Sequence, residues 1–140
     1  MDKKPPRGLR NNNPGNVRHS PDAWKGEVYP PLDADFMTFD SMAHGVRCTA
    51  KILLGYQTKG LKTIRAMVAR WAPPSENNTL AYANHVAKLT GFGIDQPMTL
   101  GEGVLRRLCA AIFNHELGGD FVTDADLSAG VRMALGLQEA

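Results

Sequence analysis

One amphipathic helix, expected over residues 101–117, restricts the possible folds of this chain more than any other feature. Apolar side chains recur there every three or four residues, the spacing that places them on one helix face: Leu105, Leu108, Cys109, Ile112 and Phe113. Glu116 falls on the same face in the last turn, directly before a double-glycine stop. The fold must therefore bury a helix face that ends in a carboxyl group.

The position of Glu116 predicts a proton donor. Apolar neighbours and the negative end of the helix dipole both disfavour a charged carboxylate, so we expect them to raise the pKa of Glu116. A carboxylic acid kept protonated in this way suits a general acid. The competing interpretation is a helix-terminal glutamate that bends toward water, because perturbed carboxylates also occur in structural networks.

The rest of the chain indicates one mainly helical domain. Its 140 residues are 43% hydrophobic and 21% charged, which is typical of a single globular domain. We expect residues 1–8 to form a flexible lead and residues 9–140 to form the domain. About five helices are expected, near 41–57, 61–71, 79–90, 102–117 and 126–135, with a small loop or hairpin region before them. The pattern T-x-x-E at Thr99–Glu102 predicts a capping box for the fourth helix.

Charge, cysteine content and hydropathy indicate which kinds of partner and which cysteine state to expect. A net charge of +2 suits an anionic polymer but lacks the strong basic footprint of a nucleic-acid binder. Cys48 and Cys109 lie in apolar helical patterns and are expected to be buried free thiols, with a disulfide between them as the alternative. No apolar run approaches the roughly 20 residues that span a bilayer, and the first residues do not resemble a signal peptide. We expect a monomer with no membrane or nucleic-acid partner.

No metal or cofactor is expected. His115 and Glu116 match the first half of the zinc motif H-E-x-x-H, but the second histidine is missing and Gly118 and Gly119 interrupt the helix that would present both ligands.

Two loops rich in turn-forming residues are candidate ligand-binding segments. Residues 11–16 (NNNPGN) carry four asparagines, whose amides can donate to and accept from hydroxyl and acetamido groups. In residues 71–79 (WAPPSENNT), Trp71 could stack on a sugar ring and Glu76 is a second candidate acid. The alternatives are a surface turn and a rigid connector in which Glu76 serves the N-terminus of the next helix.

These segments resemble a family of small phage and prophage proteins that are labelled as virion structural proteins or as lysozyme-like peptidoglycan hydrolases. The resemblance runs from residue 7 to about residue 119 and is carried by RGLRNNNPGNVR, WKG, FMTFD, GVR and RWAPPSEN. A more distant resemblance links residues 12–18, 36–41 and 71–82 to three consecutive motifs of the glucosaminidases in the lysozyme superfamily. The catalytic-glutamate helix of those enzymes precedes the three motifs, whereas here the similar segment AIFNHELGG follows them, at residues 111–119. The resemblance implies a circularly permuted lysozyme-like fold.

The resemblance also implies an activity: a muramidase that cleaves the β-1,4 bonds of peptidoglycan glycan strands with Glu116 as general acid. The candidates for a second carboxylate are Glu76, Asp35, Asp40 and Glu27. Members with a single acid use an acetamido or 6-hydroxyl group of the substrate, so hydrolysis and 1,6-anhydro formation both remain open. The remaining site residues would hold polar sugar groups (Asn12, Asn13, Asn16 and Asn77), stack on sugar rings (Trp71 and Tyr82) or meet a carboxylate (Arg18).

A non-catalytic virion structural protein with the same fold is the alternative function. In either case we expect the protein in the phage virion or the host cytoplasm. An enzyme would reach the periplasmic cell wall by a separate delivery route.

Overall fold

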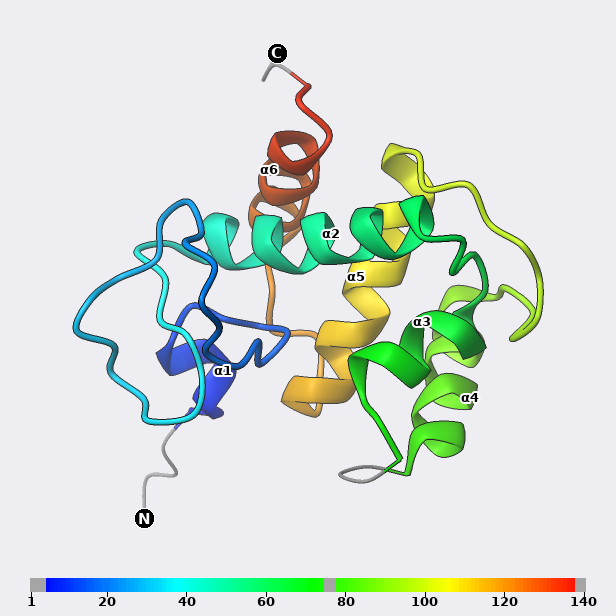
Figure 1. Cartoon of the computed structure of the whole chain (residues 1–140), viewed down its shortest axis with the longest axis horizontal. Helices are drawn as coiled ribbons and strands as arrows, with labels where there is room; N and C mark the ends of the chain where they lie inside the picture. The colour runs from blue at the N-terminus through cyan, green and yellow to red at the C-terminus, as the bar shows by residue number, and fades with distance from the viewer. Residues whose placement is uncertain (1–4, 75–77, 138–140) are drawn as a thin grey trace.

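The computed structural model describes residues 5–74 and 78–137, and this part of the chain is mainly helical. Figure 1 shows the six helices that it contains. They are α1 (Arg7–Arg10), α2 (Met42–Thr58), α3 (Ile64–Trp71), α4 (Thr79–Thr90), α5 (Glu102–Leu117) and α6 (Asp124–Ala134). The expectation of a mainly α fold is confirmed.

Helix α5 runs through the middle of the molecule and carries most of the shared core. Its apolar face packs with residues of α2, α3, α4 and α6 in one cluster, and Leu105, Cys109 and Ile112 are buried there. Helices α2 and α6 approach so closely that a Cβ on Gly130 would lie 2.5 Å from the Cβ of Val46. Helix α4 packs on the other side of α5 and α3 packs against α4, while α1 packs against α5 as well. The core therefore fixes the position of the helix that carries Glu116.

The sequence patterns place most helix ends within one residue, but α3 begins at Ile64 rather than near residue 61, and α6 begins at Asp124 rather than near residue 126. Thr63, Asn78 and Thr123 each cap the helix that follows by accepting a backbone N–H, and Gly118 ends α5 in the left-handed conformation. The capping box expected at Thr99 is wrong, because the N-cap of α5 is Gly101 and it makes no side-chain capping bond. Cys48 and Cys109 are buried free thiols, as expected.

The segment from residue 11 to residue 41 is folded loop rather than a hairpin. The only ladder contacts among the described residues are two isolated antiparallel bridges, Arg18 with Phe36 and Glu27 with Phe39. This region shares a small core with α2, formed by Met37 and Phe39 of the loops and Cys48 of the helix. The N-terminus also differs from the expected lead, since α1 already begins at Arg7 and Gly8 is buried.

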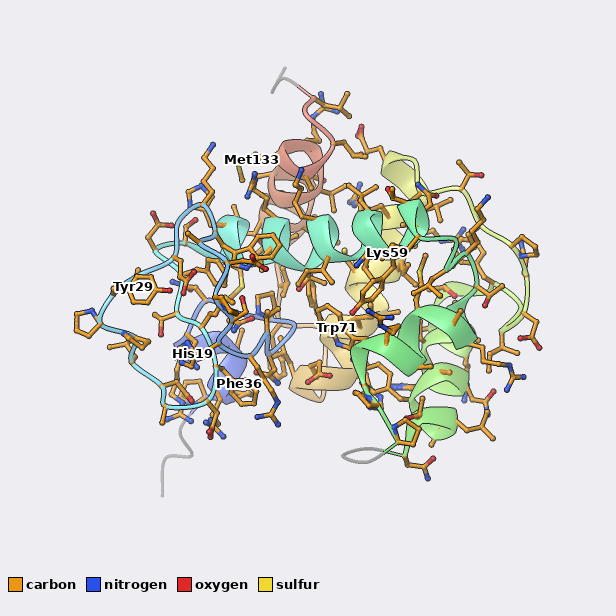
Figure 2. The ribbon with its side chains drawn as sticks, viewed as in Figure 1. His19, Tyr29, Phe36, Lys59, Trp71 and Met133 are labelled. Carbon is orange, nitrogen blue, oxygen red and sulfur yellow. The ribbon has the colours of Figure 1, made fainter. Side chains whose placement is uncertain are left out.

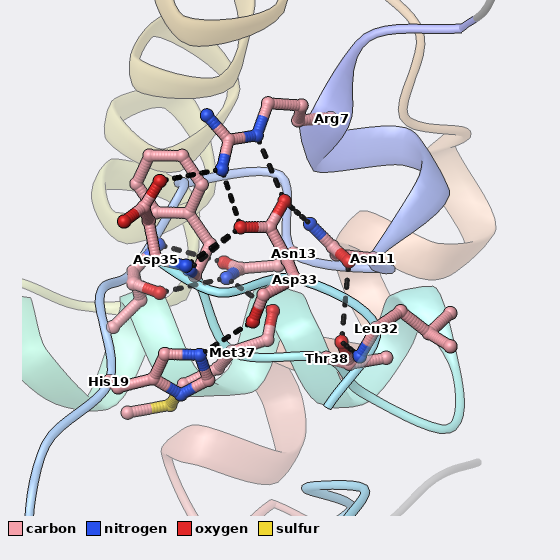
Figure 3. Close-up of polar contacts among 11 residues, drawn as sticks. Arg7, Asn11, Asn13, His19, Leu32, Asp33, Asp35, Met37 and Thr38 are labelled. Carbon is pink, nitrogen blue, oxygen red and sulfur yellow. Dashed lines mark hydrogen bonds and ion pairs between the residues drawn. The ribbon is translucent and has the colours of Figure 1, made fainter. Parts of the chain in front are cut away.

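A polar cluster around Asp33 joins α1 to these loops (Figure 3). Nε of Arg7 donates to the Asp33 carboxylate at 2.9 Å, and the same guanidinium reaches Asp35 at 3.0 Å. Nδ2 of Asn11 also donates to Asp33, and its Oδ1 accepts from the Thr38 hydroxyl. The ionic hydrogen bond from Arg7 is the main reason that the pKa of Asp33 lies well below its ordinary value.

The Asp33 cluster predicts a loss of stability in acid. The pKa of Asp33 is lower in the folded protein than in the unfolded chain, where it is about 3.9. The stability that ionised Asp33 gives the fold is therefore complete above about pH 3.9 and is lost as the pH falls toward the folded-state pKa. Asp33→Asn is therefore expected to lower the thermal midpoint at neutral pH and to flatten its decline below about pH 4. Thermal unfolding followed by circular dichroism from pH 7 to pH 2 measures both effects. Asp22→Asn, on the exposed surface of the same loops, is the control. An unchanged acid limb in Asp33→Asn would contradict the prediction.

Candidate functional site

A cleft of about 410 Å³ opens between the N-terminal loops, α2 and the end of α3, and Glu116 forms part of its wall. The loops contribute Gly15, Asn16, Val17, Arg18 and Phe36, and the helical side contributes Ile52, Tyr56, Arg70, Trp71, Ala72 and Pro73. Figure 2 shows Phe36 on the loops and Trp71 at the C-terminal end of α3, on the same side of α2. Residues far apart in the sequence thus share one concave surface.

Both oxygens of Glu116 accept hydrogen bonds from neighbouring elements. Nδ2 of Asn16 donates to Oε1 at 2.9 Å, and the hydroxyl of Tyr82 on α4 donates to Oε2 at 2.7 Å. Glu116 is half-buried and lines the cleft, so it does not turn away to solvent. The two donors fix the orientation of a carboxyl group that ligands in the cleft can reach.

The asparagine-rich loop is built to present Asn16. Asn12 and Asn16 both adopt left-handed backbone conformations, with φ of 51° and 50°, which asparagine tolerates better than most residues. Nδ2 of Asn12 donates to the Phe39 carbonyl, and buried Asn13 donates to the carbonyls of Val17 and Met37. The expected sugar-binding roles of Asn12 and Asn13 are therefore corrected: their amides hold the loop in shape. Asn16 contacts the acid from this scaffold.

Tyr82 also has a different role from the one that the sequence suggested. Its side chain is only 2% exposed, so it cannot stack on a sugar in the cleft. Burial and the nearby charge of Glu116 raise the pKa of Tyr82 above its ordinary value, which keeps the hydroxyl protonated as a donor. Behind it, the ring of His115 lies 3.7 Å from the Tyr82 ring, centroid to centroid, and Nδ1 of His115 is 2.9 Å from Nδ1 of His85. Partial burial is the main reason that the pKa of His115 is lowered; the charge of Glu116 opposes this shift, and His85 adds a smaller lowering effect.

Tyr82→Phe is expected to lower any reaction that depends on Glu116 by about 10- to 100-fold. This range corresponds to the loss of one hydrogen bond to a charged group, about 1.5–3 kcal/mol. The ring and its contact with His115 remain, so the fold should be retained. For the cell-wall lysis that the sequence resemblance implies, initial rates of the variant and the native protein measure the effect. Tyr56→Phe, with an unaltered ring on the opposite side of the cleft, is the comparison. A rate equal to that of the native protein would show that the hydroxyl does not support the acid.

Aromatic and basic side chains form the remainder of the cleft. Trp71 packs on the backbone of the asparagine-rich loop, so that a Cβ on Gly15 would lie 2.9 Å from its Cζ2. Trp71 is half-buried and remains available for stacking. The guanidinium of Arg18 lies 5.2 Å from the centroid of the Phe36 ring, and Arg70 lies on the opposite wall. Two cationic groups therefore line the same cleft as Glu116.

The other candidate carboxylates do not line the cleft in the described part of the chain. Asp35 pairs with Arg7, Asp40 pairs with His44, and Glu27 accepts from the backbone of Trp24. Glu76 and Asn77 lie outside the described residues. Glu116 is thus the one carboxyl group among the described residues of the cleft wall.

Two further observations concern metal ligands and membrane-spanning helices. Across residues 5–74 and 78–137, no three histidine, cysteine or carboxylate side chains come together as possible metal ligands. Within the same residues, none of the helices has both the length and the apolar character needed to cross a membrane.

The sequence patterns missed Tyr56, Ile52 and Arg70 as cleft residues. Tyr56 and Ile52 follow the helical pattern of α2 and look like core positions, and they do pack against the apolar clusters. The sequence could have indicated Arg70 as a site residue, because it directly precedes the candidate residue Trp71. Only the tertiary arrangement shows that these three side chains face the same space as Glu116.

The fold and the site define a class: small, mainly helical proteins with a carboxyl group in a cleft bordered by arginines and aromatic rings. No protein-family model matches the chain. The chain is 38% identical over 128 residues to protein P5 of Pseudoalteromonas phage PM2, and the match covers 89% of this chain and 79% of the relative. At this identity and coverage, the chain belongs to the family of this phage protein. The resemblance to phage proteins that the sequence indicated is confirmed.

Proposed function

We propose that this protein is a phage-associated glycosidase that cleaves the β-1,4 bonds of peptidoglycan, with Glu116 as its general acid. The observation that carries the proposal is the geometry of Glu116, which lines the cleft and is held through both oxygens by Asn16 and Tyr82. An acid that must deliver a proton to one bond benefits from such fixed orientation. The long-range contact between the asparagine-rich loop and the C-terminal end of α5 also agrees with a circularly permuted lysozyme-like arrangement.

In the proposed reaction, protonated Glu116 transfers its proton to the glycosidic oxygen. The bond between that oxygen and the anomeric carbon breaks, and positive charge develops on the sugar ring. Trp71 would stack on a sugar ring, while Arg18 and Arg70 would face carboxylates of the lactyl group or the peptide. The oxygen of a water molecule, or of the sugar's own 6-hydroxyl, then bonds to the anomeric carbon and gives its proton to the ionised Glu116, which restores the acid.

A second candidate function is a virion structural protein that keeps the fold without the chemistry. Its support is the family relationship, because the relative is a phage protein whose name, protein P5, states no activity. In that case the cleft would bind the cell wall without cleaving it. The two candidates differ in whether covalent bonds in the glycan are broken.

Digestion of purified peptidoglycan sacculi separates these candidates. If the protein is a glycosidase, mass spectrometry of the soluble fraction should detect new glycan ends. Hydrolysis produces reducing ends, and the intramolecular route produces 1,6-anhydro ends that are one water lighter. Sacculi that stay intact with the native protein, under conditions in which a reference lysozyme digests them, would contradict the enzymatic function and favour the structural one.

A further inference from the structure

Asn16 leaves one of its own polar atoms without a hydrogen bond. While Nδ2 donates to Glu116, Oδ1 is buried and has no partner among the described residues. Buried amide oxygens are nearly always paired, so an unpaired one beside a functional group needs an explanation. The residue is also held in the left-handed conformation, with φ of 50°, as are many residues whose position serves a site.

The space around the inner end of this amide is lined by another acceptor. A Cβ built on Gly8 would lie 3.1 Å from Oδ1 of Asn16, 2.9 Å from the carbonyl oxygen of Asn13 and 2.6 Å from Cδ2 of Leu117. Because Gly8 has no side chain, both oxygens can lie close to its backbone. The Asn13 carbonyl already accepts from the Asn16 backbone N–H at 3.0 Å. A carbonyl oxygen can accept a second hydrogen bond, so an N–H group in the place of Oδ1 would have an acceptor nearby, whereas Oδ1 has no donor.

The outer end of the amide faces a group whose hydrogen-bonding character changes during the proposed reaction. An ionised carboxylate only accepts hydrogen bonds, but a protonated carboxyl group also donates one. Nδ2 suits the ionised form of Glu116, and Oδ1 would suit the protonated form. Turning the amide by about 180° would therefore direct Oδ1 toward the protonated acid and Nδ2 toward the Asn13 carbonyl.

We propose that Asn16 is a positioning residue whose side-chain amide turns over as Glu116 gains and loses its proton. It donates to the ionised carboxylate through Nδ2 and accepts from the protonated acid through Oδ1. This inference rests on the proposed function of Glu116 as a general acid. It adds that one side chain supports the acid before and after proton transfer, whereas Tyr82 serves as a donor.

The test follows the orientation of the Asn16 amide directly. Nuclear Overhauser contacts from its NH₂ protons, measured across the pH range in which lysis rises and falls, should show the group beside Glu116 at high pH. At low pH the same protons should approach the Hα protons of Gly8 and the methyl groups of Leu117. An unchanged pattern of contacts would overturn the proposal.

Glu116→Gln is the matched control for this measurement. Other ionisable groups lie near Glu116: Arg18 and Arg70 line the cleft, Tyr82 donates to the carboxylate, and His115 packs on Tyr82 and contacts His85. All of them remain in Glu116→Gln, whereas the carboxyl group is lost. The amide contacts of the control should therefore not change with pH, and a change as large as that of the native protein would overturn the proposal.

The pH profile of lysis gives an independent readout. Asn16→Gly removes the amide and keeps a residue that tolerates positive φ, so the loop is not strained. If Asn16 supports both the ionised and the protonated form of Glu116, its loss should lower the lysis rate about tenfold. The pH profile of lysis should then keep its position. Tyr82→Phe, which removes only a donor to the ionised form, should shift the alkaline limb to higher pH. The same shift in Asn16→Gly would show that Asn16 is only a donor and would overturn the proposal.

These measurements distinguish a failure of the proposed function from a failure of the proposal for Asn16. If the native protein does not cleave peptidoglycan, the proposed function fails, although amide turnover is still measurable by NMR. If lysis depends on Glu116 but the amide does not turn, the proposal for Asn16 fails alone.

Discussion

Glu116→Gln is expected to reduce peptidoglycan cleavage by about 10²- to 10⁴-fold, the range attributed to a general acid. The glutamine side chain has nearly the same shape but carries no acidic proton. It can accept from either Asn16 or Tyr82, but its NH₂ group faces the other donor. We therefore expect a loss of stability of about 1–3 kcal/mol, which leaves the protein folded at room temperature. Turbidity loss of a sacculus suspension, together with thermal unfolding, measures both effects.

Glu102→Gln is the matched control for this variant. Glu102 lies at the other end of α5, where it pairs with Arg132 on the surface, far along the helix from the cleft. The same chemical change there should leave the lysis rate within about twofold, since surface pairs contribute little to stability. Full activity of Glu116→Gln would remove Glu116 as the acid and direct attention to Glu76.

Gly45→Ala is expected to have the largest effect on stability. Gly45 is buried in α2, and a Cβ there would lie 1.9 Å from the carbonyl oxygen of Asn12 and 2.9 Å from Cδ of Pro14. Because the nearest atom belongs to the backbone, relief requires the loop to move away from the helix. Overpacking of this kind costs about 3 kcal/mol, which corresponds to a decrease in the thermal midpoint of roughly 10 °C. The displaced loop carries Asn16, so lysis should fall as well.

Gly55→Ala provides the opposite result on the same helix. Gly55 is exposed in α2, and a Cβ there meets nothing within 4 Å. The better helix propensity of alanine should stabilise the protein by about 0.5–1 kcal/mol. A decrease in stability as large as that of Gly45→Ala would mean that helix geometry, rather than the contact with Asn12, explains the first result.

Helical periodicity and most of the helix caps were enough to predict the mainly helical fold and the position of Glu116 at the end of α5. The stripe from Leu105 to Phe113 buries one face of α5, and Glu116 continues along this face to the cleft. These features depend on spacing within one helix, which the local sequence contains. The loop region was harder, because side-chain amides and the Asp33 cluster replace the regular backbone ladders of a hairpin.

The roles of individual site residues required the tertiary structure. Four asparagines in a row of six indicated a binding loop, but Asn12 and Asn13 bind the backbone of their own loop region and Asn16 binds the acid. Tyr82 followed the buried pattern of α4, and nothing local shows that its hydroxyl meets Glu116. Composition identified polar and aromatic groups that suit a sugar, whereas the contacts that decide their use come from residues distant in sequence.

The hydrogen bond between Asn16 and Glu116 joins residues 100 positions apart. During synthesis on the ribosome the amide emerges long before the carboxyl group, and α2, α3 and α4 are made in between. The pair can therefore form only after most of the chain has been translated. Partly made chains contain the loop without its acid, so competence at this cleft should arise late and in a single step with the docking of α5.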